Sequence, residues 1–341
     1  MLNQHLLGSR FRGNDDSLWS GKAVACGVAV LALTCGDANA QEIAYPTRTV
    51  QIVVPYSTGT TSDILARLLG PKLSERWKVS VIADNRPGAT GAVGIAFVAK
   101  AAPDGHTLMF VPTSFTMIPA VYGKLPFDPV KSFAPVALMA TSGLALVVHP
   151  QLPVKSVREL IELAKRRPGE LYYSSPGNGS SQHLAMELFN LETGIRIVHV
   201  PYKGLAGAIT DLMGGHVQAM ISTFQTLHPY VTGGRLRMLA VMSAERSPVF
   251  PGVATLKEQG FAQLEVESWQ GVLVPAATPA AVIARLNSDI NELLRQPEIR
   301  EQLAKQGMNP AGGPPERFGA LIKSELARWS RVVAAAKIKL D

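Results

Sequence analysis

The stretch YYSSPGNGSSQHL, residues 172–184, joins a β-prone start, a turn of small residues and the beginning of a helix. The helix is predicted because apolar residues recur at positions 184, 185, 188 and 191. A strand, a glycine loop and a helix N-terminus therefore follow one another, and the unpaired N–H groups of the first helical turn point into the loop. Gly177 and Gly179 permit positive φ angles, while Ser180 and Ser181 are suited to cap the helix or to donate to a ligand. The pattern fits a site for a small anion as well as it fits a plain strand-to-helix turn.

A second unit of the same kind lies near the start of the chain. The run VQIVVP, residues 50–55, predicts a buried strand, and apolar residues at 64, 65, 68, 69 and 73 predict a helix that ends near Trp77. The loop between them, YSTGTTSD at residues 56–63, ends in Ser62 and Asp63, either of which is suited to cap the helix. The loop at residues 175–183 matches neither a phosphate-binding P-loop nor the dinucleotide fingerprint. Two loops of this kind in one chain favour a ligand that is shared between them.

Strands and helices alternate along most of the chain. Further strands are predicted at residues 79–83, 107–111, 137–148, 197–200, 219–222, 236–242 and 271–274. Helices are predicted between them and, near the C-terminus, at residues 280–296, 297–306 and 315–336. This order predicts an α/β fold of doubly wound layers. Because ligands of such sheets bind outside the carboxyl ends of the strands, the two loops are the candidate site.

Length and composition describe a globular protein. The 341 residues are 47% hydrophobic and 17% charged, which is enough for two domains with sizeable cores. The net charge of +7 favours anionic ligands. The positive charge is dispersed, with no basic cluster longer than residues 165–167, and aromatic residues are only 6% of the chain. Nucleic-acid binding is therefore not expected.

The first forty residues are predicted to be a signal peptide. Lys22 precedes an apolar run that is too short to span a bilayer, and the small residues that end at Ala40 offer a cleavage site there. The region before Lys22 is long for a signal, so we expect translation to start downstream of Met1. Both cysteines, Cys26 and Cys35, lie in this segment, so we expect the exported chain to contain no disulfide and no cysteine–zinc site.

Patterns typical of catalysis and metal binding are weak. His183 follows Ser175 by eight residues, but the chain has no Gly-x-Ser-x-Gly motif and no paired carboxylates near a glycine loop. A secreted hydrolase that uses His183 with Ser180 or Ser181 stays an alternative, although bracing of the loop is the favoured role of His183. The other histidines lack the spacing of metal ligands and are interpreted as structural or solvated. We therefore expect no enzymatic activity, no metal and no cofactor.

Six segments are distinctive when they are taken together. They are DNRPGA (84–89), APDGHTL (102–108), LPFDPV (125–130), SPGNGSSQHL (175–184), VPYKG (200–204) and SWQG (268–271). On these segments the chain resembles the Bug family, the periplasmic solute receptors of tripartite tricarboxylate transporters. The similarity runs from about Tyr45 to the C-terminus.

The resemblance implies a two-domain periplasmic binding protein of the Venus-flytrap kind, type II-like, with a discontinuous first domain. We expect residues 45–143 and 263–341 to form domain 1 and residues 144–262 to form domain 2. Closure of the domains would enclose a small organic carboxylate, which the receptor would present in the periplasm to a large and a small membrane subunit. We expect a monomer. A sensory co-receptor for a membrane kinase would use the same cleft and stays an alternative.

The resemblance also implies which residues contact the ligand. In the family the two loops hold a carboxylate through backbone N–H groups, side-chain hydroxyls and bound water. The first loop would supply Tyr56, Ser57, Thr58, Gly59, Thr60, Thr61 and Asp63, and the second Ser175, Gly177, Gly179, Ser180, Ser181 and His183. The rest of the cleft would be lined by Ser114, Tyr202, Ser222 and Thr223.

Two departures from the family pattern bear on the ligand. The first loop carries Gly59-Thr60 where a Gly-Gly pair is usual, so we expect Thr60 to be strained if its φ angle is positive. Ser222 stands where the family often has aspartate, and without that charge the site has less to offer an α-amino group. The sequence thus favours a di-, tri- or aromatic carboxylate over an amino acid.

Overall fold

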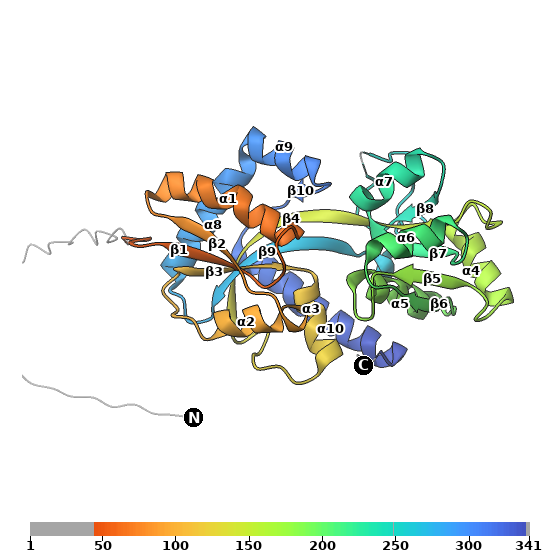
Figure 1. Ribbon diagram of the computed structural model, residues 1–341, viewed down its shortest axis with the longest axis horizontal. Coiled ribbons are helices and arrows are strands. Elements are labelled where there is room, and N and C mark those ends of the chain that lie inside the picture. Colours follow the sequence, from red (N-terminus) through yellow and green to blue (C-terminus); the bar gives the residue numbers. More distant parts are fainter. Residues whose placement is uncertain (1–43, 248, 339–341) are drawn as a thin grey trace, which may run out of the picture. The chain divides into compact units, whose positions relative to one another are not determined.

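The computed structural model describes residues 44–247 and 249–338, and their strands form one hydrogen-bonded path. The order along the path is β2-β1-β3-β9-β4-β7-β5-β6, and β8 and β10 also pair with β4 (Figure 1). The strands are β1 (Val50–Val54), β2 (Val81–Asn85), β3 (Thr107–Pro112), β4 (Phe133–Val148), β5 (Tyr172–Ser175), β6 (Val198–Pro201), β7 (Ala219–Thr223), β8 (Arg237–Val241), β9 (Glu267–Pro275) and β10 (Asn309–Pro310).

Helices connect these strands, and a helix is the last described element of the chain. The α-helices are α1 (Thr61–Trp77), α2 (Ala92–Ala99), α3 (Ser114–Tyr122), α4 (Val157–Arg166), α5 (Ser181–Thr193), α6 (Leu205–Met213), α7 (Phe224–Thr232), α8 (Ala280–Arg295), α9 (Pro297–Lys305) and α10 (Pro315–Ala336). Two short 3₁₀ helices, η1 (Ala89–Gly91) and η2 (Ala262–Leu264), complete the described elements.

Strand β4 belongs to two sheets. From Phe133 to Gly143 it pairs antiparallel with β9, and from Leu144 to Val148 it pairs antiparallel with β7 and β8. We call β1, β2, β3, β9, β10 and the start of β4 the first sheet, and β5 to β8 with the end of β4 the second sheet. The length and apolar composition of β4, which is buried almost throughout, suit a strand that is covered on both faces in two successive sheets.

Parallel pairing gives each sheet an edge at which several loops meet. In the first sheet β1 pairs parallel with β2 and β3, and in the second sheet β5 pairs parallel with β6 and β7. Helices cover both faces of each sheet, as the alternating sequence pattern predicts, although β4 and β9 make the whole arrangement mixed rather than parallel. The carboxyl ends of β1 and β3 therefore share one edge, and those of β5, β6 and β7 share another.

Helix α10 packs on both sheets. Its first half contributes Phe318 and Ile322 to the core that α2 and α3 form on the first sheet. Its last turns contribute Trp329 and Val332 to the core that α4 and α5 form on the second sheet. Between these two groups lies Glu325, which is 3% exposed and accepts a hydrogen bond from the indole of Trp329 at 2.9 Å. The helix is thus a connection between the sheets in addition to β4.

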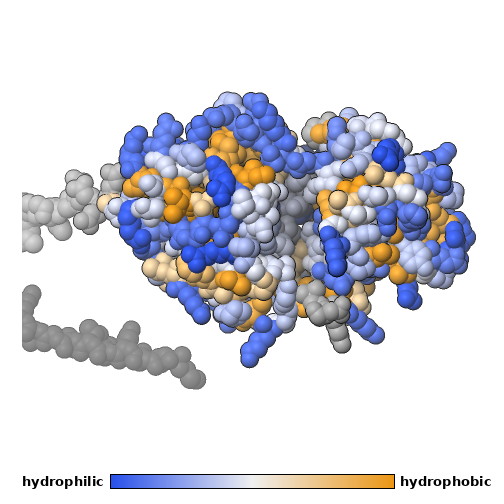
Figure 2. Space-filling model, viewed as in Figure 1, coloured by the Kyte–Doolittle hydropathy of each residue, from blue (hydrophilic) through white to orange (hydrophobic). Residues whose placement is uncertain are grey.

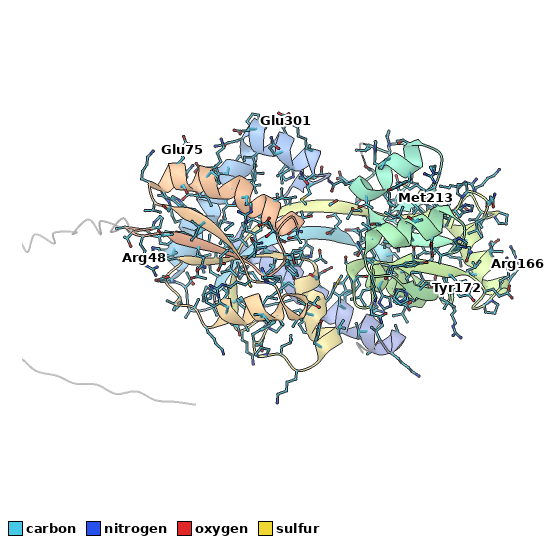
Figure 3. All side chains as sticks on the ribbon, in the orientation of Figure 1. Arg48, Glu75, Arg166, Tyr172, Met213 and Glu301 are labelled. Carbon is cyan, nitrogen blue, oxygen red and sulfur yellow. The ribbon has the colours of Figure 1, made fainter. Side chains whose placement is uncertain are left out.

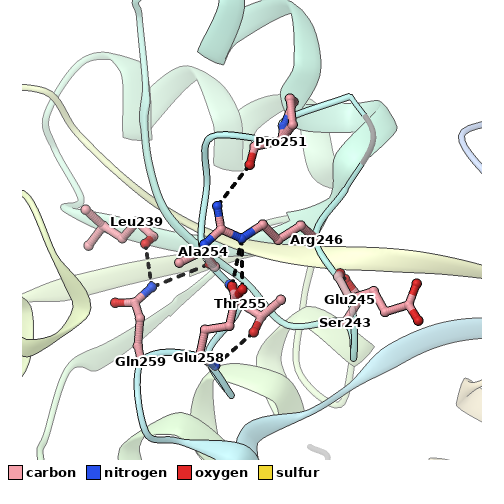
Figure 4. Close-up of polar contacts among 9 residues, drawn as sticks. All are labelled: Leu239, Ser243, Glu245, Arg246, Pro251, Ala254, Thr255, Glu258 and Gln259. Atoms are coloured by element: carbon pink, nitrogen blue, oxygen red, sulfur yellow. Dashed lines mark hydrogen bonds and ion pairs between the residues drawn. The ribbon is translucent and has the colours of Figure 1, made fainter.

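The segment between β8 and β9 returns the chain to the first sheet and is held by side chains (Figure 4). Nε of Arg246 contacts both carboxylate oxygens of Glu258 at 2.9 Å, and Nη1 donates to the carbonyl of Pro251 at 3.1 Å. The amide of Gln259 donates to the carbonyl of Leu239 at 3.1 Å. The contacts of Arg246 hold the segment on itself, and that of Gln259 joins it to β8.

Two helices lie where the sequence predicts none. Helix α3 contains Pro119 and helix α7 contains Pro229, and an internal proline removes one backbone hydrogen bond from each. Burial compensates: Phe115 and Ile118 of α3 enter the core of the first sheet, and Leu227 of α7 is fully buried. Packing on the sheets, not local propensity, makes these segments helical.

The outer face of α9 is mostly hydrophilic in Figure 2, while its Ile299 and Leu303 are buried beneath. None of the helices in the described part of the chain combines the length and the apolar composition needed to cross a membrane. The predicted signal peptide, its cleavage point at Ala40 and both cysteines lie outside the described residues.

Candidate ligand-binding site

The residues expected to contact a ligand follow the carboxyl ends of parallel strands. Tyr56 to Asp63 follow β1, Ser114 follows β3, Ser175 to His183 end and follow β5, Tyr202 follows β6, and Ser222 and Thr223 end β7. Arg166, at the end of α4, and Tyr172, at the start of β5, lie at one end of the second sheet (Figure 3). The glycine loop therefore opens at the opposite end of β5.

The loop after β1 places its glycine, not its threonine, in the left-handed region. Gly59 has a φ of 84°, whereas Thr60 has a φ of −71° and a ψ of 159°. The expectation of strain at Thr60 is therefore wrong, because this backbone is extended and any residue adopts it. Thr60 is the N-cap residue of α1, a position that the sequence assigned to Ser62 or Asp63, and its Oγ1 donates to the carbonyl of Ser57 at 2.9 Å.

Asp63 holds the loop from within. One carboxylate oxygen accepts the N–H of Gly59 at 2.9 Å, and the other accepts Nε of Arg67 at 2.9 Å. Although burial by itself would raise it, the pKa of Asp63 is lowered by these contacts and by the amide of Asn85. An ionised carboxylate whose two oxygens are already engaged shapes the loop and offers little to a second carboxylate.

Tyr56 connects the loops that follow β1 and β3. Its hydroxyl lies 3.0 Å from Oγ of Ser114. Burial raises the pKa of Tyr56 to about 12, more than the hydrogen bond from Ser114 lowers it. The two hydroxyls form a neutral pair that can both donate and accept.

The loop after β5 is capped by its own serine. Ser180 is the N-cap residue of α5, and its Oγ accepts the N–H of His183 at 3.3 Å and donates to the carbonyl of Gly177 at 2.8 Å. The prediction that a serine caps this helix is confirmed for Ser180. Because the first residues of a helix have no partner one turn earlier, the N–H groups of Ser181 and the residue after it remain available to an acceptor.

Two stacked histidines lie beneath this loop. The rings of His183 and His199 are 3.8 Å apart and 11° from parallel, and the ring of Tyr173 also packs on that of His199, at 4.9 Å and 24° from parallel. Nδ1 of His183 accepts the N–H of Gly179 at 3.0 Å, so His183 braces the loop as the sequence favoured. Nε2 of His199 lies 2.6 Å from Oγ of Ser175.

Both histidines are neutral at physiological pH. Burial, and then the neighbouring His199, lower the pKa of His183 to about 3. Burial lowers the pKa of His199 to about 4. Residues 175–183 also contain no lysine or arginine, so the loop presents hydrogen-bond donors without a positive charge.

Sequence reasoning did not connect His199 with the glycine loop. The histidine was interpreted as structural or solvated, because nothing in its neighbours along the chain connects it with the glycine loop. The parallel register of β5 and β6, which pairs Tyr173 with His199, brings its ring under the loop. Only the pairing of the strands reveals this proximity.

The remaining candidates are partly engaged elsewhere. The hydroxyl of Tyr202 donates to Asp211 at 2.5 Å, and Oγ1 of Thr223 lies 3.0 Å from that of Thr226. Ser222 is fully buried, and its Oγ is without a hydrogen-bond partner among the described residues. A buried hydroxyl of this kind at the end of a strand is costly unless something satisfies it.

The arrangement does not suit a serine hydrolase. The ring nitrogen Nδ1 of His183 is occupied by Gly179, and Oγ of Ser181 donates to the side chain of Gln182. The serine that does meet a histidine is Ser175, which is 0% exposed and therefore out of reach of a substrate. Within residues 44–247 and 249–338, no cluster of histidine, cysteine, aspartate or glutamate could hold a metal ion.

A cavity of about 990 Å³ lies beside the crossing of β4 and is not lined by any of the expected ligand contacts. Its walls come from α7, the segment after β8, and the turn between α9 and β10, and they include Phe224, Arg246 and Met308. Its basic side chains Arg246 and Lys305 are paired with Glu258 and Glu301, and its lining also contains the carboxylates of Glu245 and Glu267. The cavity therefore lies near the end of β7, but its lining does not suit an anion.

Known proteins share this sequence and this fold. The family described as tripartite tricarboxylate transporter family receptor, TctC, matches residues 65–338. A solved structure of an R. palustris protein with adipate is 36% identical, covers 86% of this chain and 99% of that one, and has a TM-score of 0.71. MatC from Rhodopseudomonas palustris, with bound malate, is 30% identical over 85% of this chain and 100% of its own, with a TM-score of 0.69.

The periplasmic binding protein BugD is also similar, with 28% identity, coverage of 86% of this chain and 99% of BugD, and a TM-score of 0.68. The resemblance to the Bug family and the α/β fold class predicted from the sequence are thus confirmed. The chain therefore belongs to the TctC, or Bug, family of periplasmic solute-binding receptors, which are not enzymes, and it has their mixed α/β periplasmic binding protein fold.

Proposed function

We propose that this receptor binds a small organic carboxylate between the loops after β1 and β3 and the loops after β5, β6 and β7. It then presents the ligand to the large and small membrane subunits of a tripartite tricarboxylate transporter. The observation that carries the proposal is that two structural relatives, at 36% and 30% identity, hold the dicarboxylates adipate and malate.

The chemistry of the loops supports an anion held by neutral groups. The helices α1 and α5 both begin in these loops, and their first N–H groups favour a negative charge. Hydroxyls of Tyr56, Ser114 and Ser181 are close to the same loops and can replace part of the hydration shell of a carboxylate. We propose that residues 45–143 with 263–341, and residues 144–262, act as two domains that close about the crossing of β4.

The side chain at the end of β7 supports a narrower ligand class. Ser222 brings a hydroxyl and no negative charge to this position, so an α-amino group would find no counter-ion there. We therefore propose a di-, tri- or aromatic carboxylate rather than an amino acid. Malate and aspartate form a matched pair for this point, because they differ only in a hydroxyl against an ammonium group.

The test is a thermal-shift and calorimetry panel on residues 41–341, unfolded and refolded to remove any ligand carried through purification. The panel holds adipate, malate, citrate, benzoate, aspartate and glutamate. A ligand at about 1,000 times its Kd adds about 4 kcal/mol of stability, which raises the unfolding midpoint by several degrees. Binding of carboxylates that lack an amino group is expected. Tighter binding of aspartate than of malate would contradict the proposed ligand class, and no binding of any acid would contradict the function.

Ser181 allows a sharper test of the site itself. It is the first helical residue of α5, a position that tolerates proline. Ser181→Pro removes one N–H donor while leaving the helix intact, and the extended backbone of Ser180 suits a following proline. A charged hydrogen bond lost in this way should weaken carboxylate binding about 10- to 100-fold. Ser181→Ala keeps the N–H group and is the matched control, so equal affinity in both variants would argue against this donor.

A further inference from the structure

The glycine loop after β5 is attached at several points to the two histidines beneath it. Nδ1 of His183 accepts the N–H of Gly179, and the backbone N–H of His183 donates to Oγ of Ser180. On the other side His199 contacts the hydroxyl of Ser175, which both accepts the N–H of Gly177 at 3.2 Å and donates to its carbonyl at 3.0 Å. We infer that His199 is a positioning residue for the ligand, because through Ser175 it sets the conformation of Gly177 and so the direction of the first N–H groups of α5. This inference rests on the proposed function.

The proton count supports this role. The hydroxyl of Ser175 has one proton and two lone pairs, and three contacts surround it. All three are satisfied when Oγ–H donates to the carbonyl of Gly177 and Oγ accepts both the N–H of Gly177 and Nε2–H of His199. In that arrangement His199 is the donor that orients the hydroxyl. Without this donor the hydroxyl is free to rotate away from Gly177.

Gly177 needs such support because its backbone is unusual. Its φ is 144°, and a Cβ there would meet the carbonyl of Tyr202 at 3.4 Å. Glycine has many accessible conformations, so ordering it costs more entropy than ordering any other residue. Contacts that hold it before the ligand arrives remove that cost from binding, which is the general benefit of preorganisation.

Two substitutions of His199 can separate its hydrogen bond to Ser175 from its ring stacking. The ring of His199 stacks with those of both His183 and Tyr173, so a phenyl ring can replace it in these contacts but cannot donate to Ser175. Glutamine has its amide nitrogen at the same number of bonds from the backbone as Nε2 of histidine, so it can donate without stacking. His199→Phe and His199→Gln therefore remove the two contributions separately.

The experiment measures the Kd of adipate and malate by calorimetry for the unaltered chain, His199→Phe, His199→Gln, Ser175→Ala and the double variant His199→Phe with Ser175→Ala. Each protein is first shown to unfold cooperatively. We expect His199→Phe and Ser175→Ala each to weaken binding about five- to tenfold, the loss expected for one neutral hydrogen bond. His199→Gln should stay within about twofold of the unaltered chain. The double variant should be no weaker than either single variant, because both remove the same contact.

Hydrogen exchange of the Gly177 and Gly179 amides in the unliganded chain supplies an independent measurement. Exchange should be faster in His199→Phe than in the unaltered chain and close to normal in His199→Gln. Equal affinity and exchange in His199→Phe and the unaltered chain would overturn the inference, as would a loss in His199→Gln as large as that in His199→Phe. If the unaltered chain binds no acid of the panel, the proposed function fails and the inference fails with it, which is a different result from equal binding by all variants.

Discussion

The ring of Phe224 occupies the space that a side chain at Gly143 would need. A Cβ placed on Gly143 would lie 2.1 Å from Cε2 of Phe224, far inside contact distance. Gly143 is the last residue of β4 that pairs with β9, and Phe224 is the first residue of α7. The absence of a side chain at Gly143 therefore lets α7 approach β4 at the point where that strand passes from the first sheet to the second.

Gly143→Ala should destabilise the protein by about 1–3 kcal/mol, because the ring or the strand must move. Chemical denaturation of the unliganded chain measures the change. Gly252→Ala is the control, since no atom lies within 4 Å of a Cβ there and its φ is not in the left-handed region. Gly143→Ala should cost less stability in a chain that already carries Phe224→Ala than in the unaltered chain. A loss of equal size in both glycine variants would contradict this account.

The stacked histidines should make stability depend on pH. The pKa values of His183 and His199 are about 3 and about 4 in the folded protein, against about 6.5 in the unfolded chain. As the pH falls below 6.5, the unfolded chain binds protons that the folded chain does not. The free energy of unfolding should therefore fall by about 1.4 kcal/mol per pH unit for each histidine, until the folded pKa is reached.

Buried glutamates act in the opposite direction and must be separated. Burial raises the pKa of Glu187, Glu267 and Glu325. Their contribution to the free energy of unfolding is therefore present at low pH and is lost as the pH rises through their folded pKa. Comparison of the unaltered chain with the double variant His183→Gln and His199→Gln isolates the histidines. The difference in unfolding free energy should grow from pH 5 to pH 6.5 in favour of the unaltered chain. Parallel curves would show that the histidines do not titrate as expected.

Glu325 should give a pH effect of its own. It accepts the indole N–H groups of Trp329 at 2.9 Å and of Trp269 at 3.4 Å, and burial raises its pKa more than these contacts lower it. Glu325→Gln keeps an acceptor for the indoles and cannot ionise, so its stability relative to the unaltered chain should rise from pH 4 to pH 7. Glu325→Ala should instead lose about 1–3 kcal/mol for each indole left without a partner. A constant difference between Glu325→Gln and the unaltered chain across this range would count against the buried, raised pKa.

The loop after β1 offers a direct test of its backbone. Thr60→Gly restores the Gly-Gly pair of the family but should cost about 0.5–1 kcal/mol, because glycine gains freedom in the unfolded chain and relieves no strain. Gly59→Ala should cost about 1 kcal/mol, because alanine is disfavoured at a φ of 84° even though no atom lies within 4 Å of its Cβ. Urea denaturation measures both. A gain in stability for Thr60→Gly would show that the threonine is strained after all.

Several features could be predicted from residues that are neighbours in the chain. The alternation of strands and helices, the two glycine loops and the N-cap at Ser180 rest on hydrophobic period, turn residues and hydrogen bonds within one turn. The bracing role of His183 belongs here as well, because Gly179 is four residues away. Such patterns are readable because their energies come from local geometry.

Other features were predicted wrongly or not at all because competing terms decide them. Helices α3 and α7 form despite Pro119 and Pro229, since burial on the sheets outweighs the lost hydrogen bond. The angle at Thr60 could not be inferred from the Gly-Gly pair of the family, because the left-handed turn is taken by Gly59 alone. In the two helices packing outweighs a local preference, and at the first loop only the observed backbone shows which residue takes the turn.

By itself, then, the sequence determined the α/β layers, the family and the places where the two glycine loops begin. Tertiary structure alone decided which side chains support those loops. His199 reaches Ser175 only because β5 and β6 pair in parallel register, and Glu325 meets Trp269 only because α10 packs on the first sheet. The residues of these pairs are 24 and 56 positions apart, so their contact depends on chain folding that no local pattern records.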